Sequence, residues 1–183
     1  MYAESTALAL PRDTASPRTF EGCFQSFSRD VHRIALRYGG GRRAFAEDVT
    51  QDVFMKLLEH LDEIDDVAAW LYRVSAHVAI SHLRREQSLL TRVRRSWSQQ
   101  RQHVDPPQEE GLELSEQARD ALARLRSLPP RERVIVCMKA LDGKSQREIA
   151  HTLSLSEGYV SKLLARAWQR MLDDGGVDHA NQG

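Results

Sequence analysis

The sequence predicts an all-α protein with two small helical domains joined by a flexible linker, the C-terminal one with a helix-turn-helix. Apolar residues recur at helical spacing over 20–87 and again from residue 114. The one β-branched run, Val134-Ile135-Val136, lies inside a helical period, so strand signals are weak. Between the periodic stretches the chain is polar and contains Pro106-Pro107, which indicates a linker.

This pattern divides the chain into five segments. They are a flexible leader (1–19), a first helical domain (20–87), the linker (88–113), a second helical domain (114–174) and a tail (175–183). The linker is basic in its first half and acidic in its second. We expect it to separate two independently packed helical units.

Composition limits the function classes. The 183 residues, 41% of them hydrophobic, suffice for one ordinary domain or two small ones. No apolar run approaches the roughly 18 residues that span a bilayer, and the N-terminus lacks the order of a signal peptide. We therefore expect a cytoplasmic protein without membrane insertion. The 26 basic and 26 acidic residues cancel, so net charge indicates no polyanionic partner.

The thiols and imidazoles indicate neither a disulfide nor a metal site. Cys23 and Cys137 lie far apart in apolar, helix-like context, which predicts buried thiols. His77 and His82 are five residues apart and fall on different helix faces, and no other His, Cys or carboxylate set has metal-site spacing. We predict no metal, no cofactor and no catalytic chemistry.

Three helices are expected in the first domain. The first starts at Phe20 and ends at Gly39-Gly40-Gly41, the second covers 45–61, and the third covers 69–86. In the second helix Leu58 is expected to face inward, beside other apolar residues. Its outer strip is acidic with one exposed Met, which suits a basic partner protein, although simple solvation explains it about as well.

The third helix has an apolar arc and an opposite arc of mixed character. The opposite arc contains Trp70, Arg73, His77, Ser81 and Arg84. An aromatic ring beside guanidinium groups suits stacking with unpaired bases and contact with their phosphates. A half-buried tryptophan among solvated arginines is an equally good interpretation of the helix taken alone.

The second domain begins with helices over 114–128 and 131–141 and continues into a helix-turn-helix pattern. Ser145 and Glu148 form a capping box at the start of its first helix, and Ser156 can cap its second. Residues that match the apolar or small positions of the motif are Ile149, Ala150, Leu153, Leu155, Val160 and Leu163. Ser154 occupies the turn position that is usually glycine.

The second helix of this motif has a polar face suited to DNA. Its residues are Tyr159, Ser161, Lys162, Ala165, Arg166 and Gln169. Lys and Arg can contact guanine edges or phosphates, and the small Ala165 permits close approach to the groove. The alternative is the solvated face of an ordinary helical hairpin, but capping, turn and both faces together favour DNA recognition.

Three blocks in order resemble a bacterial sigma factor of the extracytoplasmic function group: AEDVTQDVFMKLLEHL, AAWLYRVSAHVAISHLRRE, and LRSLPPRERVIVCMKALDGKSQREIAHTLSLSEGYVSKLLARAWQRM. The resemblance covers the two helical domains, conventionally regions two and four. It implies a subunit that binds core RNA polymerase and directs initiation at promoter DNA. Many relatives have an anti-sigma partner, so such a partner is a candidate here as well.

The resemblance also implies three sets of contact residues. For core polymerase they are Asp48, Gln51, Asp52, Phe54 and Met55, with Phe54 better placed for packing than for contact. For the minus-10 element, which relatives open to capture a flipped base, they are Trp70, Arg73, His77, Ser81, Arg84 and Arg85. For the minus-35 element in duplex form they are Tyr159, Ser161, Lys162, Ala165, Arg166 and Arg170.

The function predicted is an alternative sigma factor, and two rivals remain. A stand-alone helix-turn-helix regulator would need a dimer surface or ligand pocket in the first domain, and the sequence indicates neither. A helical adaptor or inhibitor of polymerase would never touch DNA.

Overall fold

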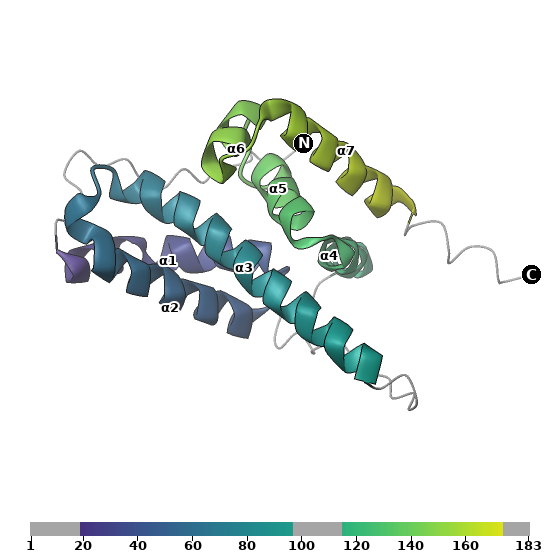
Figure 1. The fold of residues 1–183 in the computed structure, drawn as a ribbon, viewed down its shortest axis with the longest axis horizontal. Coiled ribbons are helices and arrows are strands. Elements are labelled where there is room, and N and C mark those ends of the chain that lie inside the picture. Colours follow the sequence, from purple (N-terminus) through teal and green to yellow (C-terminus); the bar gives the residue numbers. More distant parts are fainter. Residues whose placement is uncertain (1–18, 97–114, 174–183) are drawn as a thin grey trace, which may run out of the picture.

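The computed structural model describes residues 19–96 and 115–173, and these residues are helical throughout apart from short turns and caps (Figure 1). They form seven α-helices and one short 3-10 helix, which confirms the all-α prediction for the described part of the chain. Helices α1 to α3 make one bundle, and α4 to α7 lie along one side of it (Figure 1).

The first bundle consists of α1 (Phe20–Tyr38), α2 (Arg43–His60), the 3-10 helix η1 (Leu61–Glu63) and α3 (Val67–Ser96). Its fully buried side chains include Val31, Ile34, Val49, Val53, Leu57, Leu71 and Leu83. Burying each large apolar side chain contributes about 1.5–3 kcal/mol relative to exposure, so these amphipathic faces hold the three helices together.

The turn between α1 and α2 depends on glycine. Gly40 and Gly41 have φ values of 67° and 87°, which side chains with a Cβ rarely adopt. A Cβ on Gly39 would lie 2.5 Å from Cδ1 of Phe45 in α2. The glycine run therefore ends α1 and also lets α2 pack closely against the end of α1.

Helix α3 is longer than the sequence analysis predicts. It ends at Ser96, not near Glu86, so 88–96 is helical although we expected it to be linker. This stretch contains no glycine or proline, and its Arg and Leu residues favour helix. Its bias toward arginine was a misleading sign of a linker, because charged residues are good helix formers.

The second bundle consists of α4 (Glu116–Ser127), α5 (Pro130–Ala140), α6 (Gln146–Leu153) and α7 (Glu157–Asp173). Pro130 occupies the first position of α5, where its missing N–H is not needed. Arg133 in α5 donates to the carbonyl of Arg126 and, at 3.5 Å, to that of Leu128, so it satisfies carbonyls at the end of α4.

Helix α5 is buried on nearly all sides. All seven residues of 132–138 are buried, and α5 packs against α6 and α7 on one side and α1 and α3 on the other. The two bundles consequently share one continuous core, with α5 in the middle. The two helical domains that the sequence predicts are present, and α5 also packs against the first of them, because its apolar run covers more of its circumference than its own bundle can bury.

Both cysteines lie in this shared core. Cys23 and Cys137 form no disulfide and are fully buried, as the sequence predicts. Burial raises the pKa of Cys137 to about 12, so its thiol stays protonated.

Candidate nucleic-acid and polymerase interfaces

The helix-turn-helix motif has the local structure that its capping residues predict. Glu148 N–H donates to Ser145 Oγ at 3.2 Å, and Ser145 N–H donates to Glu148 Oε2 at 2.8 Å. The N–H and the hydroxyl of Ser145 both donate to the Glu148 carboxylate, and these two hydrogen bonds lower the pKa of Glu148. At the start of α7, Tyr159 N–H donates to Ser156 Oγ at 3.3 Å. A serine therefore caps the start of each helix of the motif, as predicted.

Ser154, which replaces the usual glycine, takes the left-handed conformation that the turn requires. Its φ and ψ are 53° and 47°, and it is the only non-glycine residue with positive φ in the part of the chain that the structure describes. The motif thus keeps its turn geometry, but a side chain with a Cβ is strained there.

We expect Ser154→Gly to stabilise the protein by about 0.5–1 kcal/mol, because glycine adopts this conformation without the Cβ clash. Thermal or denaturant unfolding followed by circular dichroism measures the change. Ser156→Gly is the matched control, since Ser156 Oγ accepts the N–H of Tyr159 at the start of α7 and the loss of this cap should destabilise slightly. A lower stability of Ser154→Gly would contradict the inference that the backbone of Ser154 is strained.

Helix α7 separates its two faces as predicted. Val160, Leu163, Leu164 and Ala167 are buried against α5 and α6. The exposed residues form the surface that we call the α7 face, made of Tyr159, Ser161, Lys162, Ala165, Arg166, Gln169 and Arg170. Arg170 Nη1 lies 3.5 Å from Oε2 of the buried Glu132, so it is partly neutralised by its own bundle. Arg166 and Lys162 have no carboxylate partner within salt-bridge distance in the described residues.

The corresponding surface of the first bundle is the exposed side of α3. Arg73, His77, Arg84 and Arg85 are exposed, whereas Trp70 and Ser81 are partly buried. Trp70 packs its ring against the edge of the core. The two interpretations of Trp70, as a half-buried anchor and as a stacking surface, are therefore compatible, because part of the indole remains accessible.

His77 lies between positive charges. Its Nδ1 is 3.0 Å from the carbonyl oxygen of Arg73 one turn earlier. Burial, followed by the charges of Arg73 and Arg131, lowers the pKa of His77 below its ordinary value. Arg131 belongs to α5, so this part of α3 lies next to the second bundle.

A cavity of about 600 Å³ opens beside Trp70, and part of its wall comes from residues that the sequence analysis does not name, such as Lys56 and His60. Its lining residues are Lys56, His60, Glu63, Ile64, Asp65, Asp66, Ala69, Trp70, Arg73 and Val74. They come from the end of α2, from η1 and its following loop, and from the start of α3. Periodicity within α3 alone indicates Trp70 and Arg73, but it carries no information about the side chains that α2 and the loop bring opposite them.

The outer side of α2 carries the residues expected to face core polymerase, with two changes. Asp48, Gln51 and Met55 are exposed. Phe54 is buried and packs edge-on against Phe24, with ring centroids 4.9 Å apart, so it does not reach the surface. Conversely, Leu58 was expected to face inward and is 57% exposed, because Leu57 fills the core position beside it.

Asp52 is less accessible than the other acidic residues of α2. Its Oδ2 is 2.7 Å from Nε2 of His82 on α3, and both side chains are partly buried. His82 also packs edge-on against Phe45, with ring centroids 6.1 Å apart. His82 is thus a hydrogen-bonded histidine at the boundary of the core, and it positions Asp52 against α3.

Comparison with known proteins identifies the two bundles. The model of Sigma-70 region 2 matches residues 23–89, and that of Sigma-70, region 4 matches residues 113–171. The chain belongs to the sigma-70 family. In this sigma factor α1 to α3 form region 2, and α4 to α7 form region 4.

Similar curated proteins place the sigma factor in the extracytoplasmic function (ECF) group. It is 26% identical over 163 residues to ECF RNA polymerase sigma factor SigE of Mycolicibacterium smegmatis, covering 88% of this chain and 63% of SigE. It is 24% identical over 155 residues to ECF RNA polymerase sigma factor SigM of Bacillus subtilis, covering 84% and 93% respectively. The chain thus spans less than two thirds of SigE but nearly all of SigM.

Solved structures share the fold. The sigma factor RpoE, in complex with the anti-sigma factor NepR from Bartonella quintana, superposes with a TM-score of 0.57 at 21% identity, covering 87% of this chain and 98% of that one. CnrH in complex with the cytosolic domain of CnrY gives a TM-score of 0.51 at 23% identity, with coverage of 86% and 88%.

No three His, Cys, Asp or Glu side chains lie together as a metal ion would need in residues 19–96 and 115–173. No helix within these ranges is both long and apolar enough to cross a membrane.

Proposed function

We propose that this chain binds core RNA polymerase, directs it to promoters with two spaced elements, and helps to open the DNA at the downstream one. The observation that carries the proposal is the pairing of two exposed basic surfaces in one chain of the sigma-70 family. One is the α7 face of region 4, and the other is the side of α3 that borders the cavity in region 2.

Region 4 is suited to duplex DNA of the minus-35 element. Arg166 and Lys162 project from the exposed side of a capped recognition helix, where a guanidinium can form two hydrogen bonds to guanine. Ser161 and Ala165 are small neighbours that allow the helix to enter the major groove. Tyr159 and Arg170 lie toward the edges of this face and would contact the backbone.

Region 2 is suited to a single strand of the minus-10 element. Unstacking a base costs a few kcal/mol, and stacking on an aromatic ring returns about 1–3 kcal/mol. Trp70 supplies a ring that lines a cavity with room for a base, and Arg73 and Lys56 supply positive charge for phosphates. Asp65 and Glu63 offer acceptors for the amino groups of a captured base. His77, Ser81, Arg84 and Arg85 continue the surface along α3.

The outer side of α2 is the proposed contact with core polymerase. It combines the carboxylate of Asp48 and the amide of Gln51 with the exposed apolar side chains of Met55 and Leu58. Such a mixture suits a partner with basic and apolar groups. Asp52 belongs to the same surface through the part of its carboxylate that His82 leaves exposed. Phe54 is buried below this surface and packs against it from the core.

Transcription reconstituted from purified components tests the proposal. Core polymerase, the sigma factor and sheared genomic DNA would be incubated with nucleotides, and the 5′ ends of the transcripts sequenced. We expect starts that appear only with the sigma factor and share a spaced pair of upstream motifs. Transcripts without a shared pair would contradict promoter recognition. DNA binding without any transcription would favour the stand-alone regulator, which the family assignment disfavours.

The proposal assigns the chain no catalytic step and places it where polymerase acts, in the cytoplasm. RpoE and CnrH are described as complexes with NepR and with a domain of CnrY. By analogy, an anti-sigma factor is a proposed partner of this sigma factor too. Co-purification of tagged protein from its own host tests this.

A further inference from the structure

A few polar or charged side chains are buried in the described part of the chain, and most of them have hydrogen-bond partners that account for their burial. They are Ser75, Glu132, Arg133 and Asp142. The carboxylate of Asp142, in the loop between α5 and α6, accepts hydrogen bonds from Arg37 and, at 2.8 Å, from the hydroxyl of Tyr72. Ser75 donates its hydroxyl to the carbonyl of Leu71 at 2.7 Å. Both of these side chains are satisfied within the folded chain.

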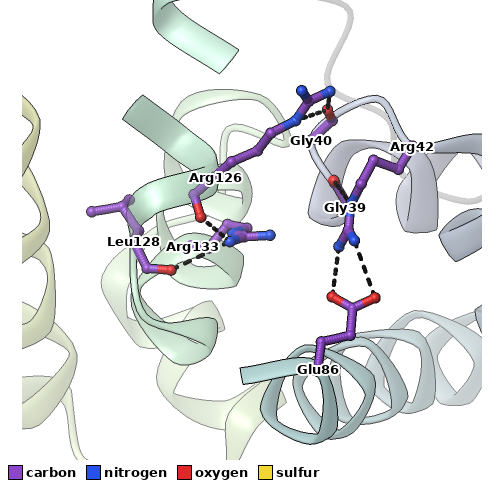
Figure 2. A network of polar contacts seen from close by, with 7 residues as sticks. All are labelled: Gly39, Gly40, Arg42, Glu86, Arg126, Leu128 and Arg133. Atoms are coloured by element: carbon purple, nitrogen blue, oxygen red, sulfur yellow. Dashed lines mark hydrogen bonds and ion pairs between the residues drawn. The ribbon is translucent and has the colours of Figure 1, made fainter. Parts of the chain in front are cut away.

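Arg133 is anchored as well, whereas Glu132 is not. Figure 2 shows the guanidinium of Arg133 beside the carbonyls of Arg126 and Leu128, to which its Nη2 donates. Among the described residues, the buried side-chain atoms without a hydrogen-bond partner are Nε of Arg133 and Oε2 of Glu132. Since Arg133 keeps its two bonds through Nη2, Glu132 is the least satisfied of the buried charges.

The cation that pairs with Glu132 is Arg170 of α7. The Glu132 side chain is 5% exposed and its Oε2 lies 3.5 Å from Arg170 Nη1, whereas the Arg170 side chain is 51% exposed. Glu132 is the third residue of α5, where the partial positive charge of a helix N-terminus also favours a carboxylate. The buried carboxylate is therefore the fixed member of the pair, and it holds the exposed guanidinium.

The geometry of this pair leaves most donors of Arg170 unused. Charge-assisted hydrogen bonds are about 2.7–2.9 Å long, so the contact with Glu132 is an ion pair without a full hydrogen bond. By contrast, Glu86 engages both terminal nitrogens of Arg42 at 3.1 and 2.9 Å (Figure 2). A guanidinium has five N–H donors in a planar fork, so an acceptor such as phosphate can bind the edge of Arg170 that Glu132 does not face.

The end of α7 that carries Arg170 is also held by α4. Arg124 donates through Nη1 to the carbonyl of Met171, the next residue, at 3.2 Å. An arginine on a free surface loses rotamer freedom when it binds a phosphate, and this loss weakens binding. A helix end fixed by α4 and a side chain oriented by α5 reduce the loss before DNA arrives.

We propose that Glu132 is a positioning residue for DNA binding: from inside region 4 it holds the guanidinium of Arg170 in place for a backbone phosphate of duplex DNA. Glu132 itself touches no DNA. The role in DNA binding rests on the proposed function of region 4, whereas the holding of Arg170 is a property of the free protein.

Nuclear magnetic relaxation of arginine Nε in the full chain, without DNA, tests the holding. Arg166 is the internal control, because it is exposed on the same helix and has no carboxylate within salt-bridge distance in the described residues. We expect a higher order parameter for Arg170 than for Arg166, and a fall to the level of Arg166 in Glu132→Gln. Equal order parameters in the wild type would overturn the proposal without recourse to any variant.

Fluorescence anisotropy of the full chain tests the effect on DNA binding, with one duplex that contains the mapped minus-35 element and one of arbitrary sequence. Glu132→Gln keeps the shape of the side chain and removes its charge. It should weaken binding to both duplexes about two- to ten-fold, because the ordering of one long side chain then accompanies binding. Tighter binding would show that the carboxylate competes with phosphate for Arg170, which would overturn the proposal.

Two further variants isolate the pair. Glu116→Gln removes one negative charge at an exposed site on α4 and should leave the affinity nearly unchanged. In an Arg170→Ala background Glu132→Gln should have no further effect, because positioning acts only through Arg170. An equal loss in both backgrounds, or a loss of helix content in Glu132→Gln, would assign Glu132 to the packing of region 4 and overturn the proposal. Absence of DNA binding by the wild type would refute the proposed function, while the order parameters would still decide whether Glu132 holds Arg170.

Discussion

Replacing Trp70 with alanine should reduce opening of duplex promoters about ten- to one-hundred-fold, because base stacking on an aromatic ring is worth about 1–3 kcal/mol. The ring lines the cavity together with Arg73, where it can stack on an unpaired base as the strand separates. On a template that is already melted the unstacking cost is absent, so the loss there should be smaller. Permanganate footprinting on duplex templates and binding to bubble templates measure the two quantities.

Trp168→Ala is the matched control for this prediction. It removes an equally large, partly exposed side chain from α7 in region 4, away from the cavity. Any loss it causes should be equal on duplex and bubble templates. Thermal unfolding of both variants is needed as well, because Trp70 packs against the core and its removal costs some stability. Equal losses on both templates for Trp70→Ala would count against a melting role.

Replacing Arg166 with alanine should weaken binding to the minus-35 element by about 1–3 kcal/mol and relax sequence preference at one base pair. Arg166 is exposed on the α7 face, so its removal leaves the core of region 4 intact. Lys162→Ala should have a different effect. Loss of a phosphate contact weakens binding to all sequences alike and lowers the salt dependence of binding. Fluorescence anisotropy with a series of minus-35 sequence variants, at several salt concentrations, measures both effects.

Two further variants make the Arg166 result specific. Arg166→Lys retains the charge but cannot form the paired hydrogen bonds to guanine, so it should restore little of the sequence preference. Arg119→Ala removes an exposed arginine from α4 and should leave DNA binding unchanged. Unchanged minus-35 recognition in Arg166→Ala would instead support an adaptor that never touches DNA.

Local features of the chain were predictable from sequence, because they depend on neighbours within one or two turns. The capping box of Ser145 and Glu148, the end of α1 at the glycine run, and the two faces of α7 all follow from local hydrogen bonding and helical period. The exposed arc of α3 was also predictable from helical period. These features sufficed to indicate a sigma factor, since the order of its motifs is itself a property of sequence.

Two sequence predictions failed, one because of tertiary packing and one because local helix propensity was underestimated. Periodicity placed Leu58 and Leu57 together on the inner side of α2, and only the packing of α1 and α3 leaves Leu58 exposed. The arginine-rich stretch after Glu86 was expected to be linker, yet it extends α3. The exposure of Leu58 depends on the packing of neighbouring helices, whereas the extension of α3 follows from the helix propensity of its own Arg and Leu residues.

The sequence by itself determined the helices, their apolar faces and the helix-turn-helix, because these arise from local propensity and spacing. The tertiary structure alone decided the cavity beside Trp70 and the docking of region 4 on region 2. The partners of Asp142 lie 70 to 105 residues earlier in the chain, and no local pattern predicts that a polar loop residue will be buried. A buried charge is stable only where distant donors converge on it, and that convergence is a property of the packed chain.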